Sequence, residues 1–139
     1  MLTLQAREQH ILREKASSNI CSNQALCALT AAVYLTAMGT EGLKETARQC
    51  AAKAHALKKE LLAAGLEPGH EGEFFHEFVT SSKGNSRKIL SALSEEGILG
   101  GLALSEDELL WCATEMNTKE EILKTASIVR SVLGKEAKA

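Results

Sequence analysis

A basic and polar cluster at residues 7–19 holds the residue types best suited to chemistry in this sequence. Its cationic side chains are Arg7, His10, Arg13 and Lys15. They precede a predicted helix whose N-cap oxygen can come from Asn19 or from the serines before it. Exposed backbone amides and the helix dipole attract anions there, and guanidinium groups bind phosphate or carboxylate through paired hydrogen bonds. Glu8 and Glu14 can instead neutralise the run as part of a solvated surface, so both interpretations stay open.

The sequence lacks the common motifs of nucleophilic catalysis and nucleotide binding. It has no G-x-S-x-G elbow, no cysteine next to a histidine and no glycine-rich phosphate loop. The glycines at 97–101 follow a predicted helix, not a strand, so we expect them in a turn. A carboxylate and an amide in residues 115–118 precede the last predicted helix, where helix capping is the favoured role. No catalytic residue is predicted.

The cysteines and histidines do not form a recognisable metal motif. Cys21, Cys27, Cys50 and Cys112 have no C-x-x-C spacing and have mostly small or apolar neighbours, so we expect free, buried thiols. Cys21 and Cys27 are six residues apart on one predicted helix. His70 and His76 are six residues apart across a glycine-containing turn. Neither spacing is typical of zinc ligands, and the sequence therefore predicts no metal site.

Length and composition predict one globular domain. Of the 139 residues, 45% are hydrophobic and 24% are charged, which is typical of a folded protein. The net charge of −2 argues against a nucleic-acid-binding surface. The apolar stretch Ala25–Met38 is shorter than the roughly 20 residues that span a membrane, and the first residues contain no apolar signal segment. We therefore expect a cytoplasmic protein without a membrane segment.

Two helices are predicted first. One spans residues 19–38 and ends at Gly39. Its apolar stripe consists of Leu26, Leu29 and Val33, and alanines make the other faces apolar, so we expect burial on most sides. The other spans residues 41–64 and ends at Gly65. Its buried face is predicted to hold Leu43, Ala47, Cys50, Ala54, Leu57 and Leu61, opposite a charged face.

Extended segments and two more helices follow. The aromatic and β-branched run at 74–79 predicts a strand, and residues 98–104 and 109–114 predict two further extended pieces. A helix that starts near Asn85 or Ser86 should end at Gly97 in a Schellman motif. The last helix should begin at the T-x-x-E capping box of Thr118 and end at Gly134.

Together these elements predict an α+β fold. Two N-terminal helices precede a small sheet of about three strands that helices cover on one face. Residues 1–18 are assigned to a charged linker or interface segment, and residues 19–139 to a single domain. The strand order is left open because pairing cannot be inferred from these patterns.

Four segments resemble motifs of the glycine cleavage system P-protein family. They are LQAREQHILREKASSNICSNQAL at 4–26, FFHEFV at 74–79, GILGGLAL at 97–104 and CATEMNTKEEI at 112–122, in the order and spacing of the family. Within the family the chain is most similar to subunit 1 of the two-subunit glycine dehydrogenases (decarboxylating). It departs from the family pattern at Leu12, where an arginine is usual, and at Ser17 and Ser22, where threonines are usual. Leu12 removes one possible anion contact.

The resemblance implies a C-terminal fragment of a longer enzyme. The matched region would be the small C-terminal domain of a fold-type I pyridoxal-phosphate enzyme, preceded by a missing large N-terminal domain. The implied reaction is decarboxylation of glycine with pyridoxal phosphate as the electron sink, followed by transfer of the aminomethyl group to the lipoyl H protein. The cofactor-binding lysine would belong to glycine dehydrogenase subunit 2. No lysine here lies in the His-Lys motif of the family, so we expect the chain alone to be non-catalytic.

By family position, one group of polar residues would lie near the join between the large and small domains. These residues are Arg7, His10, Arg13 and Asn19, with expected roles at the substrate or cofactor entrance or at the subunit interface. The alternative is a free-standing interaction or regulatory module derived from this domain. Such a module should hide its apolar surface, whereas a fragment should bury its apolar first helix against a missing domain or a partner.

Overall fold

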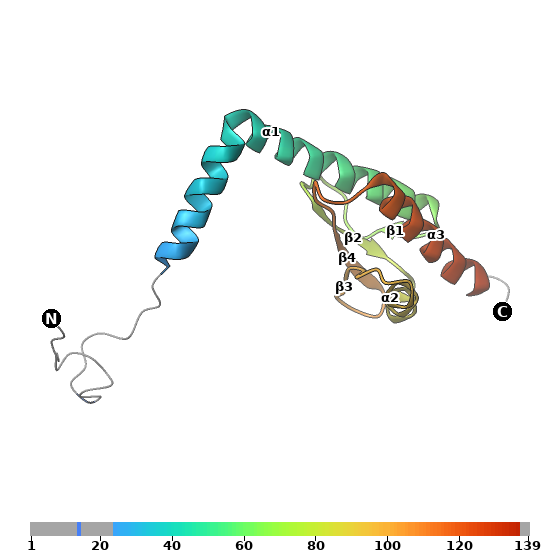
Figure 1. The fold of residues 1–139 in the computed structure, drawn as a ribbon. Coiled ribbons are helices and arrows are strands. Elements are labelled where there is room, and N and C mark those ends of the chain that lie inside the picture. Colours follow the sequence, from blue (N-terminus) through green and yellow to red (C-terminus); the bar gives the residue numbers. More distant parts are fainter. Residues whose placement is uncertain (1–13, 15–23, 137–139) are drawn as a thin grey trace, which may run out of the picture. The chain divides into compact units, whose positions relative to one another are not determined.

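The computed structural model describes residue 14 and residues 24–136 (Figure 1). The chain divides into two compact units, Met1–Gly39 and Thr40–Ala139. The described residues of the first unit are mainly the beginning of helix α1. The second unit holds the remainder of α1, a sheet and two further helices, so the predicted α+β class is confirmed.

Helix α1 (Ala25–Ala63) consists of two helical segments joined at Gly39. Gly39 has φ 60° and ψ −176°, a conformation that interrupts the helix and that glycine adopts without a clashing side chain. The predicted break between two helices at this residue is therefore confirmed. The predicted start of the first helix near Asn19 lies outside the described residues.

The first segment of α1, residues 25–38, exposes its apolar side chains. The exposed fractions are 74% for Leu26, 60% for Leu29 and 61% for Val33, so the prediction of burial on most sides is wrong for the described chain. A helix cannot cover its own outer surface, and the described part of this unit contains no second helix or strand. By length and composition alone α1 is able to cross a membrane, a test that a core helix of a soluble protein also passes.

The second segment of α1, from Thr40 onward, places one face in the core. Its buried residues are Cys50, Ala54, Leu57 and Leu61, in agreement with the predicted apolar face. Leu43 and Ala47, which the same pattern predicts to be buried, are exposed. Burial begins only at Cys50 because the earlier turns have no core residue against them. Two exposed ion pairs, Lys44 with Glu41 and Arg48 with Glu45, lie on these earlier turns.

The sheet has four antiparallel strands in the order β1-β2-β4-β3. Their bounds are Glu67–Pro68 (β1), Glu77–Ser81 (β2), Leu102–Ala103 (β3) and Glu108–Cys112 (β4). The small predicted sheet is confirmed, with β1 as an additional edge strand of two residues. Proline has no N–H group to donate to a neighbouring strand. Pro68 is tolerated in β1 because an edge strand has a neighbour on one side only.

The aromatic run before β2 does not form the strand predicted at 74–79. The strand begins at Glu77, and Phe74 instead packs against helix α1. The Phe74 ring stacks on His55 with centroids 4.1 Å apart, and it lies 5.2 Å from the ring of Phe78. Tertiary packing of this aromatic side chain therefore overrides its preference for a strand.

Three helical segments cover one face of the sheet (Figure 1): the second segment of α1, α2 (Ser86–Glu95) and α3 (Lys119–Glu136). The buried cluster contains Ala54, Leu57, Leu61, Ala64, Leu66, Phe78, Ile89, Leu93, Leu109, Trp111, Ala113, Ile122, Ala126 and Val129. Along β2 and β4 buried residues alternate with more accessible ones. Glu77 and Cys112 are consequently exposed at the ends of the two strands.

Two of the three helix ends in this unit follow the predicted glycines. Gly65 (φ 115°) follows α1 and Gly97 (φ 73°) follows α2. In each case the next N–H group donates to the carbonyl oxygen five residues earlier, from Leu66 to Leu61 at 3.2 Å and from Ile98 to Leu93 at 2.9 Å. Both are Schellman motifs. The predicted end at Gly134 is wrong, because this glycine has no positive φ and α3 continues through it to Glu136.

We expect Gly101 to be the least replaceable glycine of the sheet. An added Cβ would collide with the backbone carbonyl group of Leu110 on β4. Gly101→Ala should lower the free energy of unfolding by about 1–3 kcal/mol, measured by urea denaturation. Gly134→Ala is the matched control, since nothing lies within 4 Å of its added Cβ, and it should be neutral or stabilising. Equal loss of stability in both variants would contradict this account.

Candidate functional site

The site residues predicted from the sequence lie outside the described residues. They are Arg7, His10, Arg13 and Asn19. Their expected roles at an anion site or an interface therefore stay predictions. The described chain offers two other features: an apolar pocket and a cluster of polar groups where β2 begins and β4 ends.

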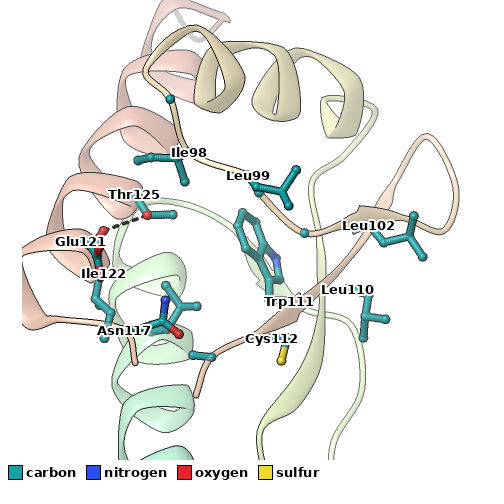
Figure 2. Close-up of a pocket in the computed structure, with 15 residues that line it drawn as sticks. Ile98, Leu99, Leu102, Leu110, Trp111, Cys112, Asn117, Glu121, Ile122 and Thr125 are labelled. Atoms are coloured by element: carbon teal, nitrogen blue, oxygen red, sulfur yellow. Dashed lines mark hydrogen bonds between the residues drawn. The ribbon is translucent and has the colours of Figure 1, made fainter. Parts of the chain in front are cut away.

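The pocket has a volume of about 640 Å³ and lies between the loop after α2, strand β4 and the start of α3 (Figure 2). Its apolar lining includes Leu57, Ile98, Leu99, Leu102, Leu110, Trp111, Ala113 and Ile122. Figure 2 shows the indole ring of Trp111 below Leu99, between the Leu102 side and the Ile122 side of the pocket. The polar lining is limited to Cys112, Asn117, Glu121 and Thr125.

Two glycines bring the loop after α2 close to its neighbours. A Cβ on Gly100 would lie 2.8 Å from Cδ1 of Leu93 and 2.9 Å from Cδ2 of Leu90, both on α2. Gly101 in turn approaches the backbone of β4 at Leu110. The sequence predicted a turn here, and the structure adds that both residues are small because the loop packs tightly on a helix and on a strand.

Trp111 is held in the pocket wall by a buried hydrogen bond. Its indole Nε1–H donates to Oγ1 of Thr80 at 2.8 Å. Trp111 is 2% exposed and Thr80 is fully buried, so the two groups satisfy each other without water. Thr80 lies on β2 and Trp111 on β4, and the bond therefore ties the two central strands together beneath the pocket.

The predicted capping box at the start of α3 is confirmed. The Thr118 N–H donates to Oε2 of Glu121 at 2.7 Å, and the Glu121 N–H donates to Oγ1 of Thr118 at 3.2 Å. Hydrogen bonds to the Glu121 carboxylate from the backbone and the side chain of Thr118 lower the pKa of Glu121 below its ordinary value of 4.5. The side chain of Asn117 also acts locally, since its Oδ1 accepts the Thr114 N–H at 2.8 Å. Thr118 and Glu121 therefore cap the helix, whereas Asn117, for which capping was the favoured role, closes the turn before it.

Glu115 connects this turn to helix α1. The Cys50 thiol donates to Oε2 of Glu115 at 3.1 Å, and the Lys53 ammonium donates to the backbone carbonyl of Glu115. The hydrogen bond from Cys50 lowers the pKa of Glu115 and raises the pKa of the thiol. Cys50 is therefore a buried structural thiol, as predicted.

Two of the other three cysteines depart from the prediction of buried thiols. Cys27 and Cys112 are exposed, and Cys21 lies outside the described residues. Cys112 is exposed because it occupies an outward-facing position at the end of β4. There its Sγ, one nitrogen of His76 and one carboxylate oxygen of Glu77 lie within 4.8 Å of one another. Spacing along the chain did not reveal this cluster, since it depends on strand pairing.

Pyridoxal phosphate, the cofactor implied by the resemblance, does not fit the pocket formed by the described residues. A phosphate group is bound chiefly by cationic side chains, often together with a helix N-terminus. The pocket lining includes no lysine, arginine or histidine, and it includes the carboxylate-bearing Glu121. An apolar side chain from a partner suits this lining better. We therefore derive no cofactor chemistry from these residues.

The chain matches the model of a known protein family. A family model described as "Glycine cleavage system P-protein" matches residues 1–129. The chain therefore belongs to the glycine cleavage system P-protein family.

Individual relatives give the same assignment. The chain is 50% identical over 140 residues to the "Probable glycine dehydrogenase (decarboxylating) subunit 1" of Moorella thermoacetica, covering 96% of this chain and 32% of that protein. It is 50% identical over 129 residues to the protein of the same name from Desulfitobacterium hafniense, covering 88% and 29%. The chain thus spans about a third of the length of these curated relatives.

A solved structure is similar as well. It is a crystal structure of glycine decarboxylase (P-protein) of the glycine cleavage system in inhibitor-bound form. The TM-score is 0.76 at 39% sequence identity, and the match covers 95% of this chain and 31% of the other. The resemblance drawn from the four motifs is therefore confirmed, including the finding that only part of a family member is represented.

Thr80→Val tests how much the buried hydrogen bond between Thr80 and Trp111 contributes to the stability of the fold. Valine keeps the shape of threonine but leaves the indole N–H of Trp111 without an acceptor. We expect a loss of about 1–3 kcal/mol in the free energy of unfolding. Trp111 is the single tryptophan, so its fluorescence during urea denaturation reports on this site. Thr80→Ser keeps the acceptor and should lose less; a larger loss for serine than for valine would argue against the hydrogen bond.

Glu121→Gln should make stability less dependent on pH in the acidic range. The pKa of Glu121 is lowered in the folded protein, so its contribution is present above the unfolded pKa of about 4.5 and is lost as pH falls through the folded pKa. The difference in unfolding midpoint between wild type and Glu121→Gln should therefore shrink on acidification below about pH 5. Glu120→Gln makes the same charge change in the same turn outside the capping box. An equal pH response of both variants would refute the assignment.

Proposed function

We propose that this chain is the C-terminal part of subunit 1 of a glycine dehydrogenase (decarboxylating). The observation that best supports this proposal is the 50% sequence identity over 140 residues to the Moorella thermoacetica protein of that name. In this proposal glycine is decarboxylated only after the chain has assembled with the rest of subunit 1 and with subunit 2. The lipoyl H protein then receives the aminomethyl group. Pyridoxal phosphate, held by a lysine of subunit 2, supplies the electron sink. The chain alone is non-catalytic.

Exposed apolar side chains around the pocket support a role in assembly. Leu99 is fully exposed, Leu102 is 61% exposed and Met116 is 77% exposed, although all three lie in motifs shared with the family. Leu99 and Leu102 line the apolar pocket itself. Large apolar side chains exposed in this way are typical of a face that another protein segment covers. This chain would then present the pocket to the rest of its own subunit or to subunit 2.

The four polar residues that lie outside the described chain also take a proposed role in the assembled enzyme. Arg7, His10, Arg13 and Asn19 would line the substrate entrance or the subunit interface, without acid–base work. The first segment of α1 would be covered in the assembled enzyme, because its apolar side chains at Leu26, Leu29 and Val33 are exposed here. The assembled enzyme is proposed to be cytoplasmic, without contact to nucleic acid or membrane.

A second candidate is a free-standing interaction module derived from the same domain. It is favoured by the self-contained core of the second unit, which includes residues from three helices and from the sheet. It is disfavoured by the exposed apolar side chains, which a solitary module should hide. The two candidates make different predictions about activity after assembly.

The test is reconstitution. The 139-residue chain is mixed with a Moorella thermoacetica subunit 1 that lacks its matching third, together with subunit 2, lipoyl H protein and pyridoxal phosphate. We expect release of CO₂ from carboxyl-labelled glycine with this chain present and only background release without it. Co-elution of the chain with the truncated subunit should accompany activity. No co-elution and no release, with the intact relative active in parallel, would leave the module as the better account.

Leu99→Asp sharpens this test. The side chain is fully exposed, so the substitution should not disturb folding, but it would place a charge in an apolar interface. We expect reconstituted activity to fall at least about tenfold. Leu123→Asp is the matched control on the exposed side of α3 and should reconstitute as the wild type does. If Leu99→Asp also reconstituted fully, the pocket face would not be the assembly surface.

A further inference from the structure

Strand pairing brings three potential metal ligands together at one end of the sheet. His76 and Glu77 lie at the start of β2, and Cys112 ends β4. Glu77 and Cys112 are direct partners in the β2–β4 register, and the Ala113 N–H donates to the His76 carbonyl oxygen at 3.1 Å just beyond the ladder. Directly paired residues project their side chains on the same face of a sheet. The backbone that positions all three groups is therefore fixed by hydrogen bonds.

The ligand atoms are close to the spacing that a small cation requires. One nitrogen of His76, one oxygen of Glu77 and Sγ of Cys112 all lie within 4.8 Å of one another. Tetrahedral zinc, with bonds of about 2.0–2.3 Å, holds its ligand atoms about 3.3–3.6 Å apart. Glu77 and Cys112 are exposed, so small rotations of their side chains close the difference without moving the core.

The histidine carries an independent sign of a missing partner. Nδ1 of His76 is buried and has no hydrogen-bond partner among the described residues. A buried polar atom without a partner costs about 1–3 kcal/mol. The Phe75 ring lies edge-on to the imidazole with centroids 4.8 Å apart, and it offers no acceptor. Coordination of a cation by this nitrogen would supply the missing interaction.

The local charge also favours a cation. Glu77 is the direct strand partner of Cys112, so its carboxylate lies beside the thiol. A thiolate beside a carboxylate is unfavourable unless a positive charge lies between them. Nitrogen, oxygen and sulfur donors together suit Zn²⁺, which is borderline soft and accepts all three.

We propose that His76, Glu77 and Cys112 form a binding site for Zn²⁺, with the fourth coordination position open to water. Binding releases the thiol proton of Cys112 to solvent and leaves the thiolate as a ligand. The site shares Cys112 with the lining of the pocket, but zinc binding can be tested on the chain by itself, without the assembled enzyme.

Titration with Co²⁺ followed by Zn²⁺ tests the proposal on the 139-residue chain in a reductant that contains no thiol. Cobalt should produce a thiolate-to-metal charge-transfer band in the near ultraviolet, and one equivalent of zinc should remove it. Competition with a chromophoric chelator gives the zinc affinity. Trp111 fluorescence during urea denaturation verifies that each variant is folded.

Variants assign the ligands. Cys112→Ser should abolish the cobalt band, and His76→Gln should weaken zinc binding at least about tenfold. Cys27→Ser is the matched control, because it removes an exposed thiol from the other unit, and it should bind as the wild type does. Absence of a thiolate band in the wild type would overturn the proposal. So would a band that persists in folded Cys112→Ser, since another thiol would then be the ligand.

Discussion

The antiparallel pairing of β2 with β4 determines which residues of these strands are buried in the core of the second unit and which are exposed on its surface. Its register joins Phe78 to Trp111 and Thr80 to Leu109, and all four side chains are buried under the helices. The same register joins Glu77 to Cys112 on the accessible face. A shift of one residue would turn the buried set outward, so the core enforces the register. The backbone positions of the polar cluster at this end of the sheet are consequently set by the same register as the core.

Three of the four segments that resemble the family lie in the described chain and come together near the ring of Trp111. Residues 74–79 lead into β2, residues 97–104 form the loop over Trp111, and residues 112–122 close the pocket from the end of β4 into α3. None of these segments could form the pocket alone. Capping bonds at Thr118 and the hydrogen bond of Trp111 fix two of its walls.

Local signals made part of this structure predictable. The Schellman glycines and the capping box at Thr118 could be read because their hydrogen bonds join residues at most five apart. Pairing of strands, the stacking of Phe74 on His55 and the approach of Cys112 to His76 depend on contacts between distant residues, which periodicity does not encode. The exposure of Leu26 was missed for a related reason: an apolar face predicts that something covers it, but does not say whether the cover belongs to the same chain.

The pocket face is suited to receive a partner because its shape does not depend on that partner. The core beneath it is closed, and the loop that carries Leu99 is held against α2 and β4 by the close approaches of Gly100 and Gly101. A surface ordered in advance loses little conformational freedom when it is covered, so more of the apolar burial appears as affinity. The first segment of α1 differs, since its apolar residues have no cover among the described residues of its own unit. Assembly would therefore stabilise that helix, whereas it would only bury a face that the second unit has already formed.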